Sequence, residues 1–174
     1  MRPATRTFSE VPPSCGPDLS LEPLTVEHAE EMAGVLADPS LYQYIGGSPP
    51  TAEHLRTRYE WLVKGSPELS VRWFNWIVRT ADGDAAGFVQ ATVGPGHGGP
   101  SAVVAWMVGA PWQGRGIATR ASRALVVWLR EHGVRRITAH IHPDNAASEG
   151  VARAIGLHRT ERWDDGEVVW TDAP

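Results

Sequence analysis

Hydrophobic and polar residues alternate in the middle of the chain with the two-residue period of half-buried strands. Residues 71–78 alternate in this way, and Asp82-Gly83 then provides a hairpin turn before a second alternating run at residues 86–93. This pattern predicts an antiparallel meander. A continuous apolar run at residues 103–108 follows, which is typical of a strand buried on both faces.

Apolar residues at helical spacing lie on both sides of the predicted meander. A short strand at residues 19–24 comes first, followed by a helix at 25–36 with Thr25 as its cap and a second helix at about 51–63. After the meander, an amphipathic helix begins at Ile117 and is closed by Gly133.

In the last part of the chain, predicted strands and helices alternate. Residues 137–141 read as a strand, which the helical crossover places parallel to the strand at 103–108. Residues 145–155 read as a helix, and two final strands flank a turn at Asp165-Gly166. The apolar face predicted for this helix consists of Ala147, Val151, Ala154 and Ile155.

Length and charge limit the classes of protein that fit. The 174 residues suit one domain, expected at residues 18–174 after a flexible, proline-rich segment at 1–17. A net charge of -4 argues against a broad nucleic-acid surface. Cys15 is the only cysteine, so an internal disulfide is excluded. Without a signal peptide or a membrane-spanning apolar run, we expect a soluble, cytoplasmic protein with no membrane partner.

The turn after the strand at 103–108 carries the strongest chemical signal. A strand, a glycine-rich turn and a helix N-terminus together present unpaired backbone N–H groups and the positive end of a helix dipole. Gly114 and Gly116 allow the main chain to approach a phosphate, and Arg115 and Thr119 add a charge and a donor. The turn lacks the lysine of GxxxxGK[ST] and the third glycine of GxGxxG, so it is neither of those phosphate loops.

Two motifs resemble one enzyme family. Residues 113–118, QGRGIA, match the pattern Q/R-x-x-G-x-G/A and, with the preceding strand, resemble the fourth strand and loop of the GNAT family of acyl-CoA-dependent N-acyltransferases. Asn145-x-x-Ser148 followed by residues 154–157, AIGL, is similar to the end of GNAT domains and most resembles the RimJ/RimL type. The resemblance implies an α/β (α+β) fold whose mixed, mostly antiparallel sheet has about seven strands, a splayed parallel pair and about four flanking helices.

The resemblance also implies acetyl-CoA, or another acyl-CoA, as co-substrate, and no metal. Met107 and Val108 would pair with the pantetheine arm, and Asn145 would orient it, unless Asn145 serves only as a helix cap. The residues expected to hold the co-substrate are Met107, Val108, Gln113, Gly114, Arg115, Gly116, Ile117, Ala118, Thr119 and Asn145.

Transfer to an amine needs a neutral nitrogen and a proton for the departing thiolate. Many relatives supply that proton from a tyrosine at the position of Ala152, so the RimJ/RimL pattern leaves Ser148 as the candidate donor here. Relatives often place a glutamate at the position of Val103. Glu167 is the remaining candidate base, although a solvated turn carboxylate explains it as well, and an acceptor with a low amine pKa needs no protein base.

The resemblance places the acceptor beside the segment between the first two helices and the closing hairpin. The candidate acceptor-binding residues are Tyr42, Tyr44, Trp106 and Trp163, and the structural alternative for the two tyrosines is packing under a helix connection. His140 and His142 share one strand face and form either half of a metal site or part of the cleft wall.

The sequence therefore predicts an N-acetyltransferase acting on a small-molecule amine or a protein N-terminus, as a monomer or homodimer. Two alternatives stay open: an acyl donor tethered to an acyl carrier protein, and a non-catalytic acyl-CoA sensor. The sensor is suggested by the missing tyrosine at Ala152 and the missing glutamate at Val103.

Overall fold

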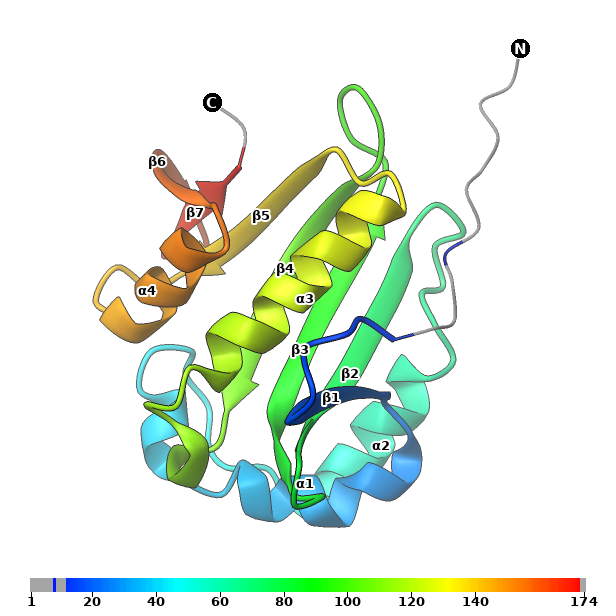
Figure 1. The fold of residues 1–174 in the computed structure, drawn as a ribbon, viewed down its shortest axis with the longest axis vertical. Coiled ribbons are helices and arrows are strands. Elements are labelled where there is room, and N and C mark those ends of the chain that lie inside the picture. Colours follow the sequence, from blue (N-terminus) through cyan, green and yellow to red (C-terminus); the bar gives the residue numbers. More distant parts are fainter. Residues whose placement is uncertain (1–7, 9–11, 173–174) are drawn as a thin grey trace.

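The computed structural model of the chain describes residue 8 and residues 12–172. A single sheet runs through this part of the molecule, in the order β1-β2-β3-β4-β5-β7-β6 (Figure 1). Its strands are β1 (Leu19–Pro23), β2 (Arg72–Thr80), β3 (Ala85–Gly94), β4 (Ser101–Val108), β5 (Arg136–Ile141), β6 (His158–Asp164) and β7 (Glu167–Thr171).

The helices occur in the predicted order along the chain. They are α1 (Ala29–Val35), α2 (Ala52–Leu62), α3 (Ile117–Glu131) and α4 (Ala146–Ala154), with short 3-10 turns η1 (Val26–His28), η2 (Pro39–Tyr42) and η3 (Ala110–Trp112). The β4 and β5 strands are parallel and the other neighbours are antiparallel. The predicted fold is therefore confirmed in its element order and its single parallel pair.

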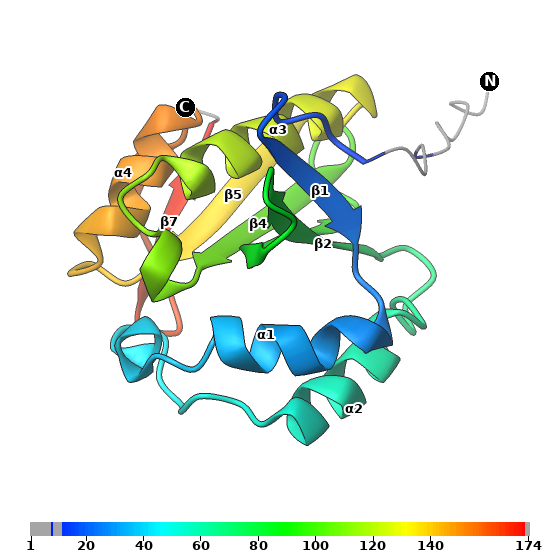
Figure 2. The same ribbon diagram turned by 60° about the horizontal axis from the view of Figure 1, so that its bottom comes forward.

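Helices cover both faces of the sheet. Figure 2 shows α1 and α2 on one face and α3 and α4 on the other. The α3 face buries Val104, Leu125 and Ile137 in one apolar cluster, while the opposite face buries Met32 and Ile77 in a second. Alternate residues of β2, β3 and β4 point to the two clusters, which is why the sequence shows a two-residue period there.

The prediction of the apolar face of α4 is partly wrong. On α4, Ala147 and Ala154 are exposed, and Ala152 is the buried residue. Because α4 begins at Ala146 and lies against the sheet through Val151, Ala152 and Ile155, the two alanines at its ends face solvent.

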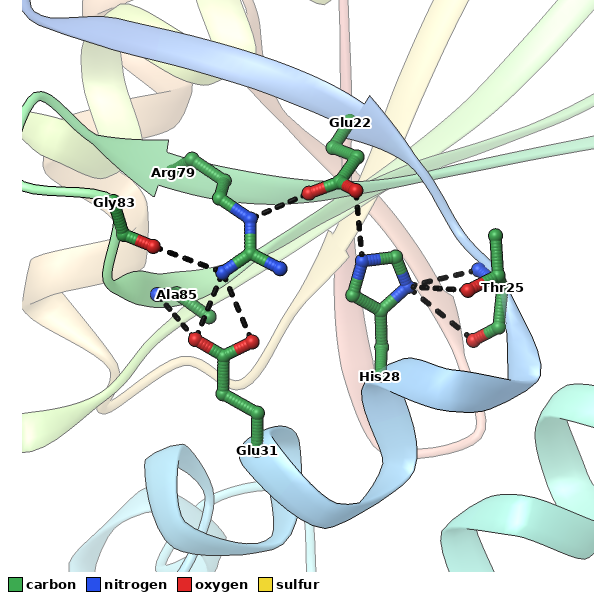
Figure 3. Close-up of polar contacts among 7 residues, drawn as sticks. All are labelled: Glu22, Thr25, His28, Glu31, Arg79, Gly83 and Ala85. Atoms are coloured by element: carbon green, nitrogen blue, oxygen red, sulfur yellow. Dashed lines mark hydrogen bonds and ion pairs between the residues drawn. The ribbon is translucent and has the colours of Figure 1, made fainter.

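A network of charged side chains fixes α1 to the edge of the sheet (Figure 3). Arg79 of β2 donates from Nη1 to Glu31 of α1 at 2.8 Å and from Nε to Glu22 of β1. Glu31 also accepts the backbone N–H of Ala85 at 2.9 Å. The hydrogen bonds from Arg79 hold the pKa of both carboxyl groups below their usual range. Helix α1 is thus held against the sheet.

The predicted flexible segment at residues 1–17 falls largely outside the described residues. Within the described part, the ring of Phe8 packs 4.9 Å from Phe74 and 5.5 Å from Trp128, centroid to centroid. No helix in the part of the chain that the structure describes is both long enough and apolar enough to cross a bilayer.

Candidate active site

The β4 and β5 strands pair at one end and separate toward the other. Their only register partners join residues 101–103 to residues 136–138, although β4 continues to Val108 and β5 to Ile141. Figure 1 shows the two strands diverging toward the end of the sheet where α3 begins. The separation leaves main-chain groups of both strands without a strand partner and opens a gap in the middle of the sheet.

The direction of the β4 main chain is set by its pairing with β3. The N–H of Gly109 donates to the carbonyl of Ala86 at 2.8 Å, so the alternate residue Met107 also turns its main-chain groups toward β3. Trp106 and Val108 therefore direct theirs toward the gap. Met107 lines the site with its side chain, while the main-chain donors and acceptors on the gap side belong to its two neighbours.

The loop from Gln113 to α3 presents a row of backbone donors. The backbone N–H groups of residues 114–119 have no acceptor among the described residues, and the first helical bond runs from Arg120 to Gly116. Gly114 and Gly116 have φ values of +73° and +71°, in the left-handed region that favours glycine. With the N-terminus of α3 behind them, these donors fit a diphosphate.

Gln113 ties this loop to the end of β4. Its Nε2 donates to the carbonyl of Val108 at 3.0 Å. The side chain therefore fixes the distance between the donor row and the gap. Its contact is with the protein's own backbone, which makes Gln113 a positioning residue in this structure.

A cavity of about 530 Å³ lies against the loop, and we call it the loop cavity. Ser40 and Leu41 of the segment between α1 and α2 line it, as do Ala147 and Val151 of α4. It brings together nearly all of the residues predicted to hold the co-substrate: Met107, Val108, Gln113, Gly114, Gly116, Ile117, Ala118, Thr119 and Asn145. Arg115 is exposed and does not line it.

A second cavity, the gap cavity, has a volume of about 510 Å³ and follows the separation of β4 and β5. Ser148 and Glu167 both line it, so the two predicted catalytic residues share one space. His140 lines it as well, with Nδ1 3.4 Å from the carboxylate of Asp164. No three His, Cys, Asp or Glu side chains among the described residues are grouped to hold a metal ion.

Ser148 sits where the loop and gap cavities meet. It lies in the first turn of α4, and its backbone N–H donates to Oδ1 of Asn145 at 3.1 Å. Asn145 is thus the helix cap, and it lines both cavities. Ala152, one turn after Ser148, is fully buried and lines none of the cavities described here.

A third cavity, the helix cavity, lies between α2, the segment at residues 36–50 and the sheet, and has a volume of about 460 Å³. Tyr42 lines it, donating from its hydroxyl to the carbonyl of Leu36 at 3.0 Å, and burial raises the pKa of this phenol. Ile45 and Trp106 line all three cavities. The three spaces therefore converge on these two side chains.

The other two predicted acceptor residues, Tyr44 and Trp163, lie in different surroundings. Tyr44 lines the loop and gap cavities, and its ring lies 5.3 Å from that of His142. Trp163 is 58% exposed on the edge strand β6 and lines none of the three cavities. Sequence reasoning missed Ile45, which lies in a segment without periodicity and gains its place only from the fold.

Comparison with known protein families assigns the chain to one of them. A profile of the acetyltransferase (GNAT) domain matches residues 18–158. The chain belongs to the GNAT acetyltransferase family. This membership confirms the predicted family and, with it, the predicted class of enzyme and co-substrate, an N-acetyltransferase that uses acetyl-CoA.

Solved structures share the fold of this GNAT domain. RimL, a ribosomal L7/L12 alpha-N-protein acetyltransferase in complex with coenzyme A, is 16% identical with a TM-score of 0.73, over 94% of this chain and 100% of that one. An aminoglycoside acetyltransferase in complex with coenzyme A is 21% identical with a TM-score of 0.69, over 88% and 92% of the two chains. At these identities the likeness concerns the fold.

A curated relative matches over a shorter length. The L-2,4-diaminobutyric acid acetyltransferase of Streptomyces avermitilis is 38% identical over 76 residues, which are 42% of this chain and 41% of the relative. The match thus spans less than half of either protein.

Proposed function

We propose that this GNAT acetyltransferase transfers the acetyl group of acetyl-CoA to the primary amine of a small molecule by direct attack. The observation that carries the proposal is the separation of β4 and β5 after Val103 and Thr138, with the donor row at residues 114–119 at the open end. A thioester arm anchored at that row reaches the point where the three cavities converge.

The residues of the loop cavity bind the co-substrate. Acetyl-CoA supplies the acyl group as an activated thioester. The N–H groups of residues 114–119 hold its diphosphate, and the gap-side main-chain groups of Trp106 and Val108 pair with the pantetheine arm. Asn145 has its amide nitrogen available for a carbonyl of that arm.

The residues of the gap cavity manage the protons. Glu167 accepts the proton of the acceptor's ammonium group, directly or through water, and leaves a neutral amine. The amine nitrogen then forms a bond to the thioester carbon and the carbon–sulfur bond breaks. Ser148 passes its hydroxyl proton to the departing thiolate and regains a proton from the newly bonded nitrogen, directly or through water, which leaves a neutral amide and a free thiol. No covalent enzyme intermediate is needed.

The size of the helix cavity supports a small acceptor. Its volume of about 460 Å³ lies within the range of pockets for small molecules, roughly 300–1,000 Å³. The curated relative acts on a small diamino acid according to its name, which agrees with this choice.

A panel of acceptors tests the proposal. Thiol release from acetyl-CoA is measured with small diamines, amino acids, an aminoglycoside and a peptide with a free N-terminus. We expect the highest kcat/KM for a small amine, with one acetyl group added per thiol released. Selective turnover of the peptide, or no turnover with any amine while coenzyme A still binds, would overturn the proposal.

A further inference from the structure

The helix cavity has an unusual balance of charge for a site that receives a cationic amine. Arg58 and His54 line it, and no aspartate or glutamate does among the described residues. The adjoining gap cavity has the opposite character, because Asp165 and Glu167 line it. The two spaces share Trp106 and therefore form one path whose ends differ in charge.

Arg58 is free to bind an anion. It lies on α2 one turn after His54, and it makes no ion pair with any residue that the structure describes. Burial raises the pKa of Tyr59 to about 12, and the positive charge of Arg58 acts in the opposite direction. Burial likewise raises the pKa of Tyr42, which also lines the cavity, and the charge of Arg58 again acts in the opposite direction.

The two acidic residues of α2, Glu53 and Glu60, do not line the helix cavity. Glu53 lines a shallow depression on the outer side of α2, which it shares with His54 and Arg58, but it does not line the helix cavity. Arg56, two residues from Arg58, donates to Glu30 of α1 at 2.9 Å and lines neither space. Neighbouring arginines of one helix thus differ, one neutralised and one unpaired at the cavity.

Neutral amides complete the polar lining. Asn75 of β2 and Gln90 of β3 are register partners, and both line the cavity from the sheet. Their side chains donate and accept hydrogen bonds but carry no charge. Apart from His54 and Arg58, the α2 side chains that line the cavity are Leu55, Tyr59 and Leu62. An anion that enters this cavity can therefore pair with the charge of Arg58.

We propose that the acceptor is a small amine that also carries a carboxylate, with the carboxylate held by Arg58 and the amine directed to the junction at Ile45 and Trp106. The proposal rests on the proposed function and adds the chemical class of the acceptor. A guanidinium matches a carboxylate with two parallel hydrogen bonds, which fixes both the position and the orientation of the ligand. The amine end then points toward the acidic gap cavity, where Glu167 lies.

Paired acceptors that differ by one carboxylate test the assignment. Ornithine is compared with putrescine and lysine with cadaverine, using the full chain with saturating acetyl-CoA. We expect kcat/KM to be at least about tenfold higher for each amino acid, the size of effect that one charged hydrogen-bonded pair provides. Equal values within both pairs, or higher values for the diamines, would overturn the proposal.

Substitutions on α2 locate the effect. Arg58→Ala removes the preference, chiefly through KM, and Arg58→Glu reverses it in favour of the diamines. Arg56→Ala is the matched control, and it keeps the preference of the natural protein. Both substituted positions are exposed on α2, and thermal unfolding checks that each of the three variants is folded. A preference that survives in Arg58→Glu contradicts the assignment.

A binding measurement separates this inference from the proposed function. Calorimetric titration of ornithine and putrescine into the protein saturated with coenzyme A requires no turnover. Tighter binding of ornithine that is lost in Arg58→Ala supports the carboxylate site even if no amine is acetylated. Turnover of amines without any difference between ornithine and putrescine leaves the proposed function intact and refutes the carboxylate site.

Discussion

Val103 of β4 and Thr138 of β5 are the last register partners before the two strands separate. Beyond them, β5 keeps its pairing with β7 through Ile141, while β4 keeps its pairing with β3 through Val108. Each strand thus stays hydrogen-bonded on its outer side and is free on its inner side. The pairing on the outer sides thus holds the two halves of the sheet on either side of the gap.

The left-handed turn at Gly116 is expected to be sensitive to substitution. In Gly116→Ala the new side chain meets no atom within 4 Å, but φ stays at +71°, which costs about 1–2 kcal/mol for a residue with a Cβ. We expect a lower free energy of unfolding and weaker coenzyme A binding, measured by denaturant titration and calorimetry.

Gly150→Ala is the control for that substitution. Gly150 lies inside α4, has open space around it and does not have a positive φ. Alanine there should stabilise the helix by about 0.5–1 kcal/mol and leave coenzyme A binding unchanged. Equal behaviour of the two variants would show that the conformation of the loop does not matter for binding.

Gly87 of β3 allows β4 to approach closely behind the site. A Cβ at this position would lie 2.1 Å from the carbonyl oxygen of Met107 and 2.9 Å from Cα of Val108. Gly87→Ala must therefore displace β4 where it borders the gap, and we expect a loss of about 1–3 kcal/mol in stability together with a raised KM for acetyl-CoA. Gly94→Ala in the same strand, with its nearest contact at 3.6 Å, should have little effect on either quantity.

Ser148 should affect turnover rather than binding. Ser148→Ala keeps the backbone N–H that caps α4 through Asn145, so the helix start is preserved. If the hydroxyl supplies the proton to the thiolate, kcat falls by about 10²-fold while the dissociation constant of coenzyme A stays the same. Ser148→Thr retains a hydroxyl and should keep more of the activity. Unchanged kcat in Ser148→Ala would remove Ser148 from the mechanism.

The Arg79 network predicts how stability depends on pH. Hydrogen bonds from Arg79 lower the pKa of Glu22 and Glu31 from the ordinary value of 4.5, so their contribution is complete above that value. It is lost as the pH falls through the lowered pKa values. Arg79→Met should cost about 1–2 kcal/mol at pH 7, since the carboxylates are part-exposed, and clearly less at pH 3.

An exposed pair provides the comparison for the network. Arg56→Met breaks the contact with Glu30, in which the side chains are 46% and 73% exposed, and should cost less than about 1 kcal/mol. Urea titrations from pH 3 to pH 7 measure both variants. A difference between Arg79→Met and the natural protein that does not shrink toward pH 3 would contradict the role given to the carboxylates.

Much of the fold could be predicted from the sequence because its periodicities are local. The meander follows from alternation around Asp82-Gly83, and the parallel pair follows from the helix that separates β4 from β5. The donor row could also be predicted, since a strand, two glycines and a helix start lie within a few consecutive residues. These features depend on neighbours in the chain, which a sequence displays directly.

The rest of the site depends on contacts that the sequence does not display. In the sequence, Gly87 is an ordinary strand glycine, and only the fold places the carbonyl of Met107 beside it. Arg58 and Arg56 are likewise equivalent in the sequence, and only the contact of Arg56 with Glu30 distinguishes them. For Trp163 the sequence predicts a place in the acceptor site that the fold does not provide. The residue is close to the final turn in the sequence, but it lies on the edge strand β6, where it is exposed and lines none of the three cavities.

A crystal structure of the protein grown with acetyl-CoA measures most directly whether the gap and the donor row act together. The account predicts diphosphate oxygens within hydrogen-bonding distance of main-chain nitrogens between Gly114 and Thr119, and the thiol arm between β4 and β5 with its acyl end near Trp106. A co-substrate bound elsewhere, with the loop and the gap both free of it, would contradict the account.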